Sequence, residues 1–380
     1  MKIGITTFGA DGGKSGIGQY LINLLREFSS SFHEDTFEVI AHESECEVFA
    51  QPTDNFRLCR VSDRLRDPLL NIAWHQLVLP DLCRRRGYDV LFLPAGNRRL
   101  PIVAPCPTVG TVHDFSSLHV EQKYDHARMG YIKHVLPRLV RRLTKVITVS
   151  ESAKQDIVEY ARVCADRVIV TPLAADKSKF VPVGAPQSAR RVQTELGLEG
   201  PYILYVSRIE HPGKNHVRLI QAFDKLKAAS AIPHQLVLAG AARERAAEVF
   251  RAARASPFSD AIRFTEFVPV DVLPALYRGA DVFVFPSLYE GFGLPLLEAM
   301  GCGTAVACSN VSSLPEVAGD AAILFDPCDT DAMSLAMRSL ITDPALKNDH
   351  VQRGFRRSAG FEWSVTASRT LDVLHCAANP

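Results

Sequence analysis

The sequence lacks the features that mark membrane-spanning, secreted and metal-binding proteins. No apolar run approaches the roughly 18 residues that a membrane span requires. The opening stretch MKIGITTFGA is typical of a strand that enters a glycine-rich loop, not of a signal peptide. The nine cysteines form no CxxC pair, and neither they nor the twelve histidines cluster with metal-ligand spacing. We therefore expect free thiols, a cytoplasmic location and no metal site.

An excess of charge of either sign is also missing. The chain carries 43 Lys and Arg against 42 Asp and Glu, a net charge of +1. Because a protein that binds polyanions usually carries a clear basic excess, no nucleic-acid partner is expected. The hydrophobic fraction of 47% and the charged fraction of 22% are ordinary for a globular protein. At roughly 100–200 residues per domain, 380 residues favour two domains.

Short apolar runs alternate with amphipathic stretches along the whole chain. Helical patterns at 18–28, 71–86 and 127–143 separate the runs of the first half. Such alternation predicts an α/β fold with two Rossmann-like, doubly wound parallel sheets facing across a cleft. The polar, Pro- and Gly-bearing stretch 174–200 is interpreted as a linker with a short helix. The predicted strands are 2–8, 37–42, 89–94, 108–114, 145–150, 167–173, 202–207, 235–240, 262–268, 281–286, 305–309 and 321–325.

The stretch EGFGLPLLEAM (290–300) joins a predicted strand to a predicted helix and carries a carboxylate near each end. Gly291 and Gly293 permit a tight turn and a close approach of ligand to backbone. We expect Pro295 at the helix start and Glu298 in the first turn, where free N–H groups favour an anion. The pattern suggests a phosphorylated ligand with hydroxyls, although ordinary helix capping is the alternative.

A second glycine-rich loop, GADGGKSGIGQY (9–20), follows the first predicted strand. Its spacing is not G-x-G-x-x-G, and only Glu43 follows the second strand as a candidate ribose ligand. A dinucleotide site is therefore disfavoured. A loop whose backbone approaches a phosphate stays open.

Charged and titratable side chains follow two further strands. Arg208 and Lys214 lie in SRIEHPGKN (207–215), after a strand and before a helix, where two cations suit a diphosphate. His113 and Asp114 end another strand, so they should reach a ligand at the carboxyl edge of the first sheet. The alternatives are a solvated loop for the two cations and a structural role for the histidine.

Together these segments resemble glycosyltransferase family 4, the retaining, nucleotide-sugar-dependent enzymes of GT-B architecture. The segment 280–327 matches the family's E-x7-E region, with Glu290 and Glu298 as its glutamates. Similarity extends to 202–223, which looks like the family's R…K segment, to 167–176, to the His113 segment and to the terminal helix at 361–374, and the N-terminal match is the looser one. The resemblance implies an N-terminal acceptor domain, 1–175 with a crossing helix at about 363–380, and a C-terminal donor domain, 176–362.

The resemblance also implies roles for named residues. Arg208 and Lys214 would hold the diphosphate of the leaving nucleotide, and Glu298 would accept hydrogen bonds from the ribose hydroxyls. Glu290 would orient the donor sugar, and His113 would touch it near the reacting centre. Further donor contacts are implied for Gly16, Phe267, Val268, Gly291, Phe292, Gly293 and Leu294.

The implied reaction is a metal-independent hexosyl transfer with retained anomeric configuration and no cofactor. The bacterial mannosyltransferases that build surface polysaccharides are the most similar group, so GDP-mannose is the favoured donor and uridine-diphosphate sugars the alternative. The acceptor would be a glycan or a polyprenyl-linked glycan. His113 and Glu290 are the candidate general bases. A retaining sugar phosphorylase and a non-catalytic nucleotide-sugar-binding subunit are the rival functions.

A basic amphipathic stretch could bring the protein to a membrane. The predicted helix 131–145 places five cations among aliphatic residues, and Arg84, Arg85 and Arg86 end an earlier helix. Such a surface could dock peripherally on anionic lipid at the inner face of the membrane. The alternative is a helix that faces the core and exposes a solvated basic side.

Overall fold

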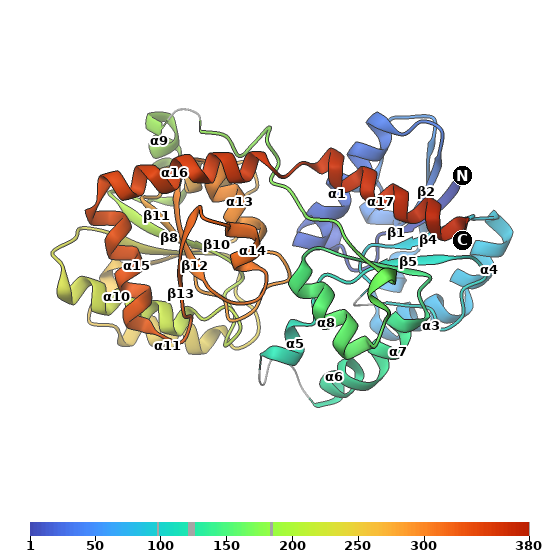
Figure 1. Cartoon of the computed structure of the whole chain (residues 1–380), viewed down its shortest axis with the longest axis horizontal. Helices are drawn as coiled ribbons and strands as arrows, with labels where there is room; N and C mark the ends of the chain where they lie inside the picture. Colours follow the sequence, from blue (N-terminus) through green and yellow to red (C-terminus); the bar gives the residue numbers. More distant parts are fainter. Residues whose placement is uncertain (97–98, 121–125, 183–184, 380) are drawn as a thin grey trace. The chain divides into compact units, whose positions relative to one another are not determined.

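The computed structural model describes residues 1–96, 99–120, 126–182 and 185–379. The chain divides into two compact units. Unit 1 holds Met1–Phe115, His126–Leu173 and Glu362–Pro380, and unit 2 holds Ser116–Asp125 and Ala174–Phe361. Each unit contains one parallel sheet with helices on both faces (Figure 1). The two sheets confirm the predicted α/β class with two doubly wound domains.

The sheet of unit 1 has seven parallel strands in the order β3-β2-β1-β4-β5-β6-β7. Most of these strands are buried apolar runs, as expected for a parallel sheet covered on both faces. The strand order reverses between β1 and β4, which is where the carboxyl ends of a doubly wound sheet form a crevice. The strands are β1 (Lys2–Thr6), β2 (Thr36–His42), β3 (Phe56–Val61), β4 (Val90–Leu93), β5 (Thr108–Thr111), β6 (Lys145–Thr148) and β7 (Val168–Val170).

Strand β3 was not predicted from the sequence. Its residues FRLCRV include Arg57 and Arg60, so the apolar run that identified the other strands is missing. Both arginines are exposed, and β3 pairs only with β2. An edge strand has one open side, so charged residues are tolerated there and help to prevent pairing with other chains.

Helices α1 and α17, far apart in the sequence, pack against each other over the sheet of unit 1 (Figure 1). The predicted helix 71–86 is split at Val78, and the predicted helix 127–143 contains a π-helical turn, Tyr131–Val135, just before Pro137. The helices are α1 (Gly16–Ser31), α2 (Cys46–Phe49), α3 (Pro68–Leu77), α4 (Leu79–Arg86), α5 (Ser116–His119, in unit 2), α6 (His126–Gly130), α7 (Leu136–Arg142), α8 (Glu151–Ala161) and α17 (Trp363–Ala378).

The sheet of unit 2 has six parallel strands in the order β10-β9-β8-β11-β12-β13. This is the doubly wound order again, and it reverses between β8 and β11. The loops that follow β8 and β11 therefore meet at the carboxyl edge of the sheet. The strands are β8 (Tyr202–Val206), β9 (Gln235–Ala239), β10 (Ile262–Glu266), β11 (Val282–Phe285), β12 (Ala305–Ser309) and β13 (Ala322–Phe325).

The helices of unit 2 cover both faces of its sheet, with α13 and α16 on one side and α10 and α15 on the other (Figure 1). Helix α9 lies within the predicted linker. The helices are α9 (Ala185–Leu196), α10 (His216–Ala229), α11 (Ala246–Ala255), α12 (Leu273–Gly279), α13 (Leu294–Gly301), α14 (Leu314–Ala318), α15 (Thr330–Thr342) and α16 (Pro344–Ala359).

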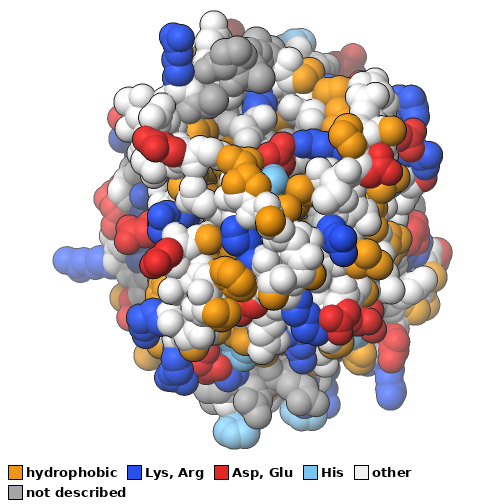
Figure 2. Space-filling view, turned by 90° about the vertical axis from the view of Figure 1, so that its left-hand side faces the viewer, with side chains coloured by type: hydrophobic (Ala, Val, Ile, Leu, Met, Phe, Trp, Pro, Cys, Tyr) orange, Lys and Arg blue, Asp and Glu red, His pale blue; other side chains and the backbone are white. Residues whose placement is uncertain are grey.

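Charges of both signs are mixed on the surface. Figure 2 shows lysine and arginine side chains interspersed with aspartate and glutamate over one face, as the net charge of +1 suggests. Among the described residues, the structure contains no helix that combines the length and the apolar character needed to cross a bilayer.

Gly240, just after β9, is required by the close approach of another loop. Its φ is +148°, and a Cβ there would lie 1.9 Å from the carbonyl oxygen of Ser207. We expect Gly240→Ala to cost about 2 kcal/mol of unfolding free energy or more, because backbone must shift to relieve the overlap. Differential scanning calorimetry should show a melting temperature lowered by several degrees. The control is Gly360→Ala, whose Cβ would lie 3.4 Å from its nearest neighbour. Equal melting temperatures for the two variants would contradict this.

Candidate functional site

Two loops of unit 2 meet where the strand order reverses. Residues 207–215 follow β8 and residues 286–293 follow β11. The backbone N–H of Leu288 donates to the carbonyl of Gly213 at 2.9 Å. The buried Asn215, with φ 59°, donates from its amide to the carbonyl of Pro286 at 2.9 Å and to that of Pro327 at 2.7 Å. These bonds fix the two loops against each other.

Lys214 and Glu290 form an ion pair across these loops. The Lys214 Nζ lies 2.6 Å from the Glu290 Oε1, and each side chain is 16% exposed. Tyr205 donates its hydroxyl to the carbonyl of Lys214 at 2.9 Å. The backbone N–H of Glu290 donates to Ser312 Oγ at 3.0 Å, and its carbonyl accepts from Ser313 at 2.9 Å. The backbone of both charged residues is therefore held by hydrogen bonds, and both side chains are poorly solvated.

The glycine-rich turn leads directly into α13. Gly293 has φ 97°, and a Cβ there would lie 2.6 Å from Leu314 Cδ2, so only glycine fits without a shift. The hydroxyl of Ser313 also donates to the carbonyl of Phe292 at 2.9 Å. Gly293 is the N-cap of α13 and supplies no side-chain acceptor. Pro295 has no N–H, and the Leu296 N–H donates to the carbonyl of Gly293 at 2.9 Å, so the Leu294 N–H is the group in this first turn that can meet an anionic ligand.

Glu298 lies deeper in the helix than the sequence analysis expected. Since α13 begins at Leu294, Glu298 occupies the second turn and not the first. Its Oε2 accepts a hydrogen bond of 2.8 Å from the Tyr277 hydroxyl. Burial raises the pKa of its carboxyl to about 7, against an ordinary value of 4.5, while the Tyr277 hydrogen bond and Lys179 lower it. A ligand hydroxyl that donated to this carboxylate would favour its ionised form.

Arg208 is the outermost of these charged groups. Its side chain is 51% exposed, and Nη2 lies 3.2 Å from Oε2 of Glu210, which is only 7% exposed. Behind it, His216 is buried and contacts Ser207 Oγ at 3.2 Å through Nε2. Burial lowers the pKa of His216 to about 3, so the imidazole is neutral at physiological pH. The positive charge of this loop therefore comes from Arg208 and Lys214.

The other sequence-predicted residues divide between the units. In unit 2, Phe267 is 56% exposed and Val268 is buried, just after a bulge that ends β10. Gly16 and His113 belong to unit 1. Gly16 is the first residue of α1, and a Cβ there would meet open space. His113 is buried, and its Nε2 lies 2.9 Å from the carbonyl oxygen of Pro94.

Several partners in this site were missed from the sequence. Tyr277 binds Glu298 from α12, and Glu210 binds Arg208 from within the same loop. Ser313 supports the glycine-rich turn from the segment that follows β12. The ring of His119 stacks on that of Tyr289, with centroids 4.4 Å apart. The sequence feature that could have indicated one of these partners was the serine pair in NVSSLP, which follows a strand at the same edge of the sheet.

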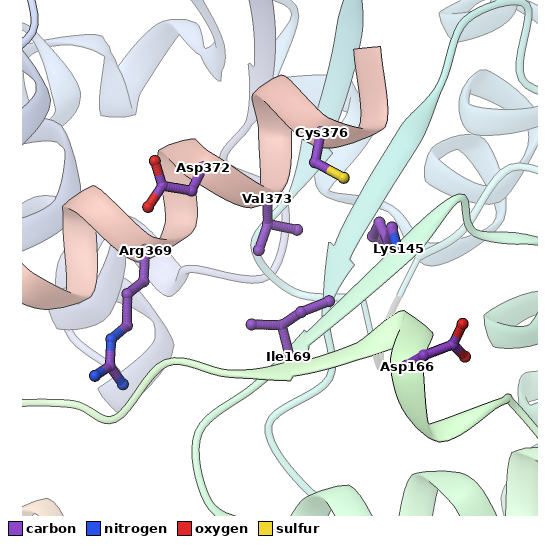
Figure 3. Close-up of a pocket in the computed structure, with 7 residues that line it drawn as sticks. All are labelled: Lys145, Asp166, Ile169, Arg369, Asp372, Val373 and Cys376. Carbon is purple, nitrogen blue, oxygen red and sulfur yellow. The ribbon is translucent and has the colours of Figure 1, made fainter. Parts of the chain in front are cut away.

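A separate hollow lies in unit 1 beneath α17 (Figure 3). It has a volume of about 260 Å³. In the close-up, Val373 and Ile169 face the space, whereas the carboxylates of Asp166 and Asp372 point away from it. Lys145 is the first residue of β6, so the hollow lies at the amino end of the strands. The sequence-predicted site residues do not line it. The remaining lining residues are Arg369 and Cys376.

Within the described ranges, no group of three or more His, Cys, Asp or Glu side chains could hold a metal ion. The charged groups at the carboxyl edge of unit 2 are thus two cations, Arg208 and Lys214, and three carboxylates, Glu210, Glu290 and Glu298, beside a helix N-terminus. Such a set can bind a diphosphate through the cations and sugar hydroxyls through the carboxylates.

Comparison with known proteins identifies relatives over nearly the whole chain. Residues 14–179 match the family described as Glycosyltransferase Family 4, and residues 187–357 match Glycosyl transferases group 1. An Escherichia coli protein named O-antigen chain mannosyltransferase B is 30% identical over 370 residues, which cover 94% of this chain and 95% of the relative.

Solved structures share the fold at low sequence identity. Anabaena Alr3699/HepE, in complex with UDP and glucose, aligns with a TM-score of 0.76 at 16% identity over 99% of this chain and 100% of that chain. A sucrose-phosphate synthase from Thermosynechococcus elongatus aligns with a TM-score of 0.75 at 19% identity over 99% and 98%. Both support the GT-B architecture.

The raised pKa of Glu298 predicts a pH-dependent contribution to stability. Between about pH 4.5 and about pH 7 the folded state holds the Glu298 proton that the unfolded state releases, so the free energy of unfolding falls as pH rises through this window. Glu298→Gln keeps an acceptor for Tyr277 and removes the titration. We expect equal stability at pH 4.5 and a variant more stable at pH 8, by on the order of 2 kcal/mol. Urea unfolding at both pH values, with the exposed Glu266→Gln as control, measures this. A difference independent of pH would contradict it.

Proposed function

The chain belongs to glycosyltransferase family 4, and we propose that it transfers mannose from GDP-mannose to a glycan or polyprenyl-linked glycan acceptor. The observation that carries this proposal is the ion pair of Lys214 and Glu290, held at the reversal point of the unit-2 sheet beside the N-terminus of α13. The name of the Escherichia coli relative supports mannose. The UDP complex of the Anabaena protein keeps uridine-diphosphate sugars as the alternative donors.

The proposed donor spans the carboxyl edge of unit 2. Arg208 and Lys214 bind the diphosphate, together with the backbone N–H groups at Gly293 and Leu294. Glu298 accepts from the ribose hydroxyls. Glu290 orients the sugar.

The remaining proposed contacts are those that the resemblance to the family implies. Gly291 and Phe292 contact the sugar hydroxyls and the distal phosphate through their backbone, and Phe267 and Val268 contact the base. From unit 1, Gly16 contributes backbone near the phosphates and His113 touches the donor sugar.

We propose that the reaction retains the anomeric configuration and needs neither metal nor cofactor. The bond between the anomeric carbon and the β-phosphate oxygen breaks, and its electron pair stays on the diphosphate. Lys214 and Arg208 stabilise that developing charge, which is the largest contribution assignable to named side chains. The acceptor hydroxyl attacks from the same face, and its proton passes to a phosphate oxygen of the leaving group. His113 and Glu290 are the alternative bases.

The two rival functions predict different outcomes in an activity assay. A sugar phosphorylase would release sugar phosphate in the presence of inorganic phosphate, and a non-catalytic subunit would bind nucleotide without turnover. The transferase names of the relatives favour neither.

We propose that the protein works at the cytoplasmic face of a membrane. Its nine cysteines are all free thiols, which suits a reducing compartment. The exposed cations of Tyr131–Val135 and α7, including Lys133 and Arg138, would meet anionic headgroups.

Replacing Lys214 tests the proposed role in turnover. We expect Lys214→Met to lower kcat/KM with GDP-mannose by roughly 10²–10³-fold, because the leaving diphosphate loses a poorly solvated cation. The assay contains EDTA and a bacterial lipid-linked mannan primer. The matched control is Lys225→Met, on the exposed surface of α10, which should retain activity.

A second variant guards against misfolding. Lys214→Met leaves Glu290 without its partner, so Lys214→Met/Glu290→Gln, which restores neutrality, should recover the melting temperature but not the activity. Near wild-type turnover by either variant would overturn the role of Lys214. Activity that EDTA abolishes in the wild type would overturn metal independence.

A further inference from the structure

Helix α3 exposes an apolar face to solvent. Its sequence PLLNIAWHQL buries Asn71, Trp74 and His75 against unit 1. On the opposite side, Leu69 is 76% exposed and Leu77 is 75% exposed. A helix at a protein surface normally carries polar residues on that side. Helix α3 is instead largely apolar all around, which is expected of a helix that is covered on both faces.

Neighbouring side chains extend this face. The backbone N–H of Ile102 donates to Gln76 Oε1 at 2.8 Å, and the amide of Gln76 donates to the carbonyl of Leu100 at 3.1 Å, so the segment carrying Ile102 lies beside α3. We define the apolar surface as seven residues, each between 45% and 76% exposed. They are Leu69, Leu70, Ile72, Leu77, Val78, Ile102 and Val103.

This surface gathers a large part of the exposed apolar side chains. Fifteen large apolar side chains of the described residues are exposed. Seven of them form this surface, and the other eight are scattered over both units. A concentration of this kind marks an interaction site, whereas single exposed aliphatic residues need no explanation.

Cations border the apolar surface, and one carboxylate, Asp67, caps α3 beside it, where its Oδ1 accepts from the backbone N–H groups of Leu69 and Leu70 at 2.9 and 3.0 Å. Arg142 of α7 donates from Nη1 to the carbonyl of Ile102 at 3.1 Å, which joins the basic side of α7 to the apolar surface. Residues 68–80, 100–107 and 126–150 contain no Asp or Glu. The occupant of this surface should therefore be apolar at its centre and anionic at its rim.

A second copy of the chain fits this requirement poorly. A two-fold interface would bring the same cationic segments together, without carboxylates from those segments to neutralise them. An anionic lipid bilayer offers acyl chains next to phosphate headgroups, which matches both features.

Most aliphatic residues of 131–145 do not supply the apolar contact, and Val135, at 44% exposure, is the exception. Ile132, Leu136 and Val140 are buried in unit 1, so this stretch presents a basic outer side, the alternative that the sequence left open. We propose that the apolar surface on α3 and the Ile102 segment inserts into the acyl–headgroup boundary of an anionic bilayer. This inference rests on the membrane contact proposed above but not on the identity of the transferred sugar.

Vesicle sedimentation with the full chain tests the insertion. Vesicles of phosphatidylcholine alone and with 30% phosphatidylglycerol are compared at low salt, without donor or acceptor. We expect binding to the anionic vesicles, reduced at least tenfold by Leu69→Gln/Leu77→Gln, since two exposed leucines lose their apolar contact with lipid. The matched control is Leu335→Gln, which removes a leucine that is 62% exposed in unit 2 and should change nothing. Circular dichroism confirms that each variant folds.

Two results would overturn the inference. Wild-type protein that stays in solution with anionic vesicles excludes lipid as the occupant, and a concentration-dependent dimer in light scattering would then identify a second copy instead. Unchanged binding of Leu69→Gln/Leu77→Gln, together with lost binding of Lys133→Gln/Arg138→Gln, would leave a purely electrostatic contact and contradict insertion. Sugar transfer to a soluble primer stays independent of all these outcomes.

Discussion

The ion pair between Lys214 and Glu290 is the interaction around which the site of unit 2 is arranged. Two opposite charges at 2.6 Å, each with 16% exposure, cost much desolvation and are tolerated because each neutralises the other. The surrounding bonds from Tyr205, Ser312 and Ser313 hold the backbone that presents them. Binding a diphosphate here means that Lys214 gains a second anionic partner in a place where charges interact strongly. In the absence of ligand, Glu290 thus neutralises Lys214, and the cation is already in position to bind a diphosphate.

The doubly wound sheet explains why these groups meet at all. Residues 207–215 and 286–293 lie more than 70 positions apart, yet β8 and β11 are neighbours at the point where the strand order reverses. Parallel strands bring all their carboxyl ends to one edge, so a loop after each strand contributes to one site. Gly240 and Gly293 are the positions where this crowding leaves no room for a Cβ. The same sheet order in unit 1 puts Gly16 and His113 beyond the carboxyl ends of their own strands.

Much of this arrangement could be predicted because buried parallel strands are continuous apolar runs, and a glycine or a charge that follows such a run must lie at the ligand-binding edge. Strand β3 was not predicted because its arginines interrupt the apolar run. The partners of the charged residues were not predicted for another reason. Tyr277 contacts Glu298 only because α12 packs on α13, and no local sequence pattern encodes that packing. The outer face of α3 was also not predicted from the sequence, since this helix buries the polar Asn71 and His75 and exposes leucines, which is the reverse of the usual apolar periodicity. The prediction that Glu298 lies in the first helical turn was wrong because it depended on the first residue of α13. That helix start is set by the cap at Gly293 and not by the apolar pattern.

The central claim is that the carboxyl edge of the unit-2 sheet binds the diphosphate of a nucleotide sugar through Lys214. A crystal structure of the protein with GDP, prepared without divalent metal, tests it most directly. The account predicts a phosphate oxygen within hydrogen-bond distance of Lys214 Nζ and the ribose hydroxyls on Glu298. A diphosphate bound elsewhere in the chain, or held only by groups other than Arg208, Lys214 and the N-terminus of α13, would contradict it.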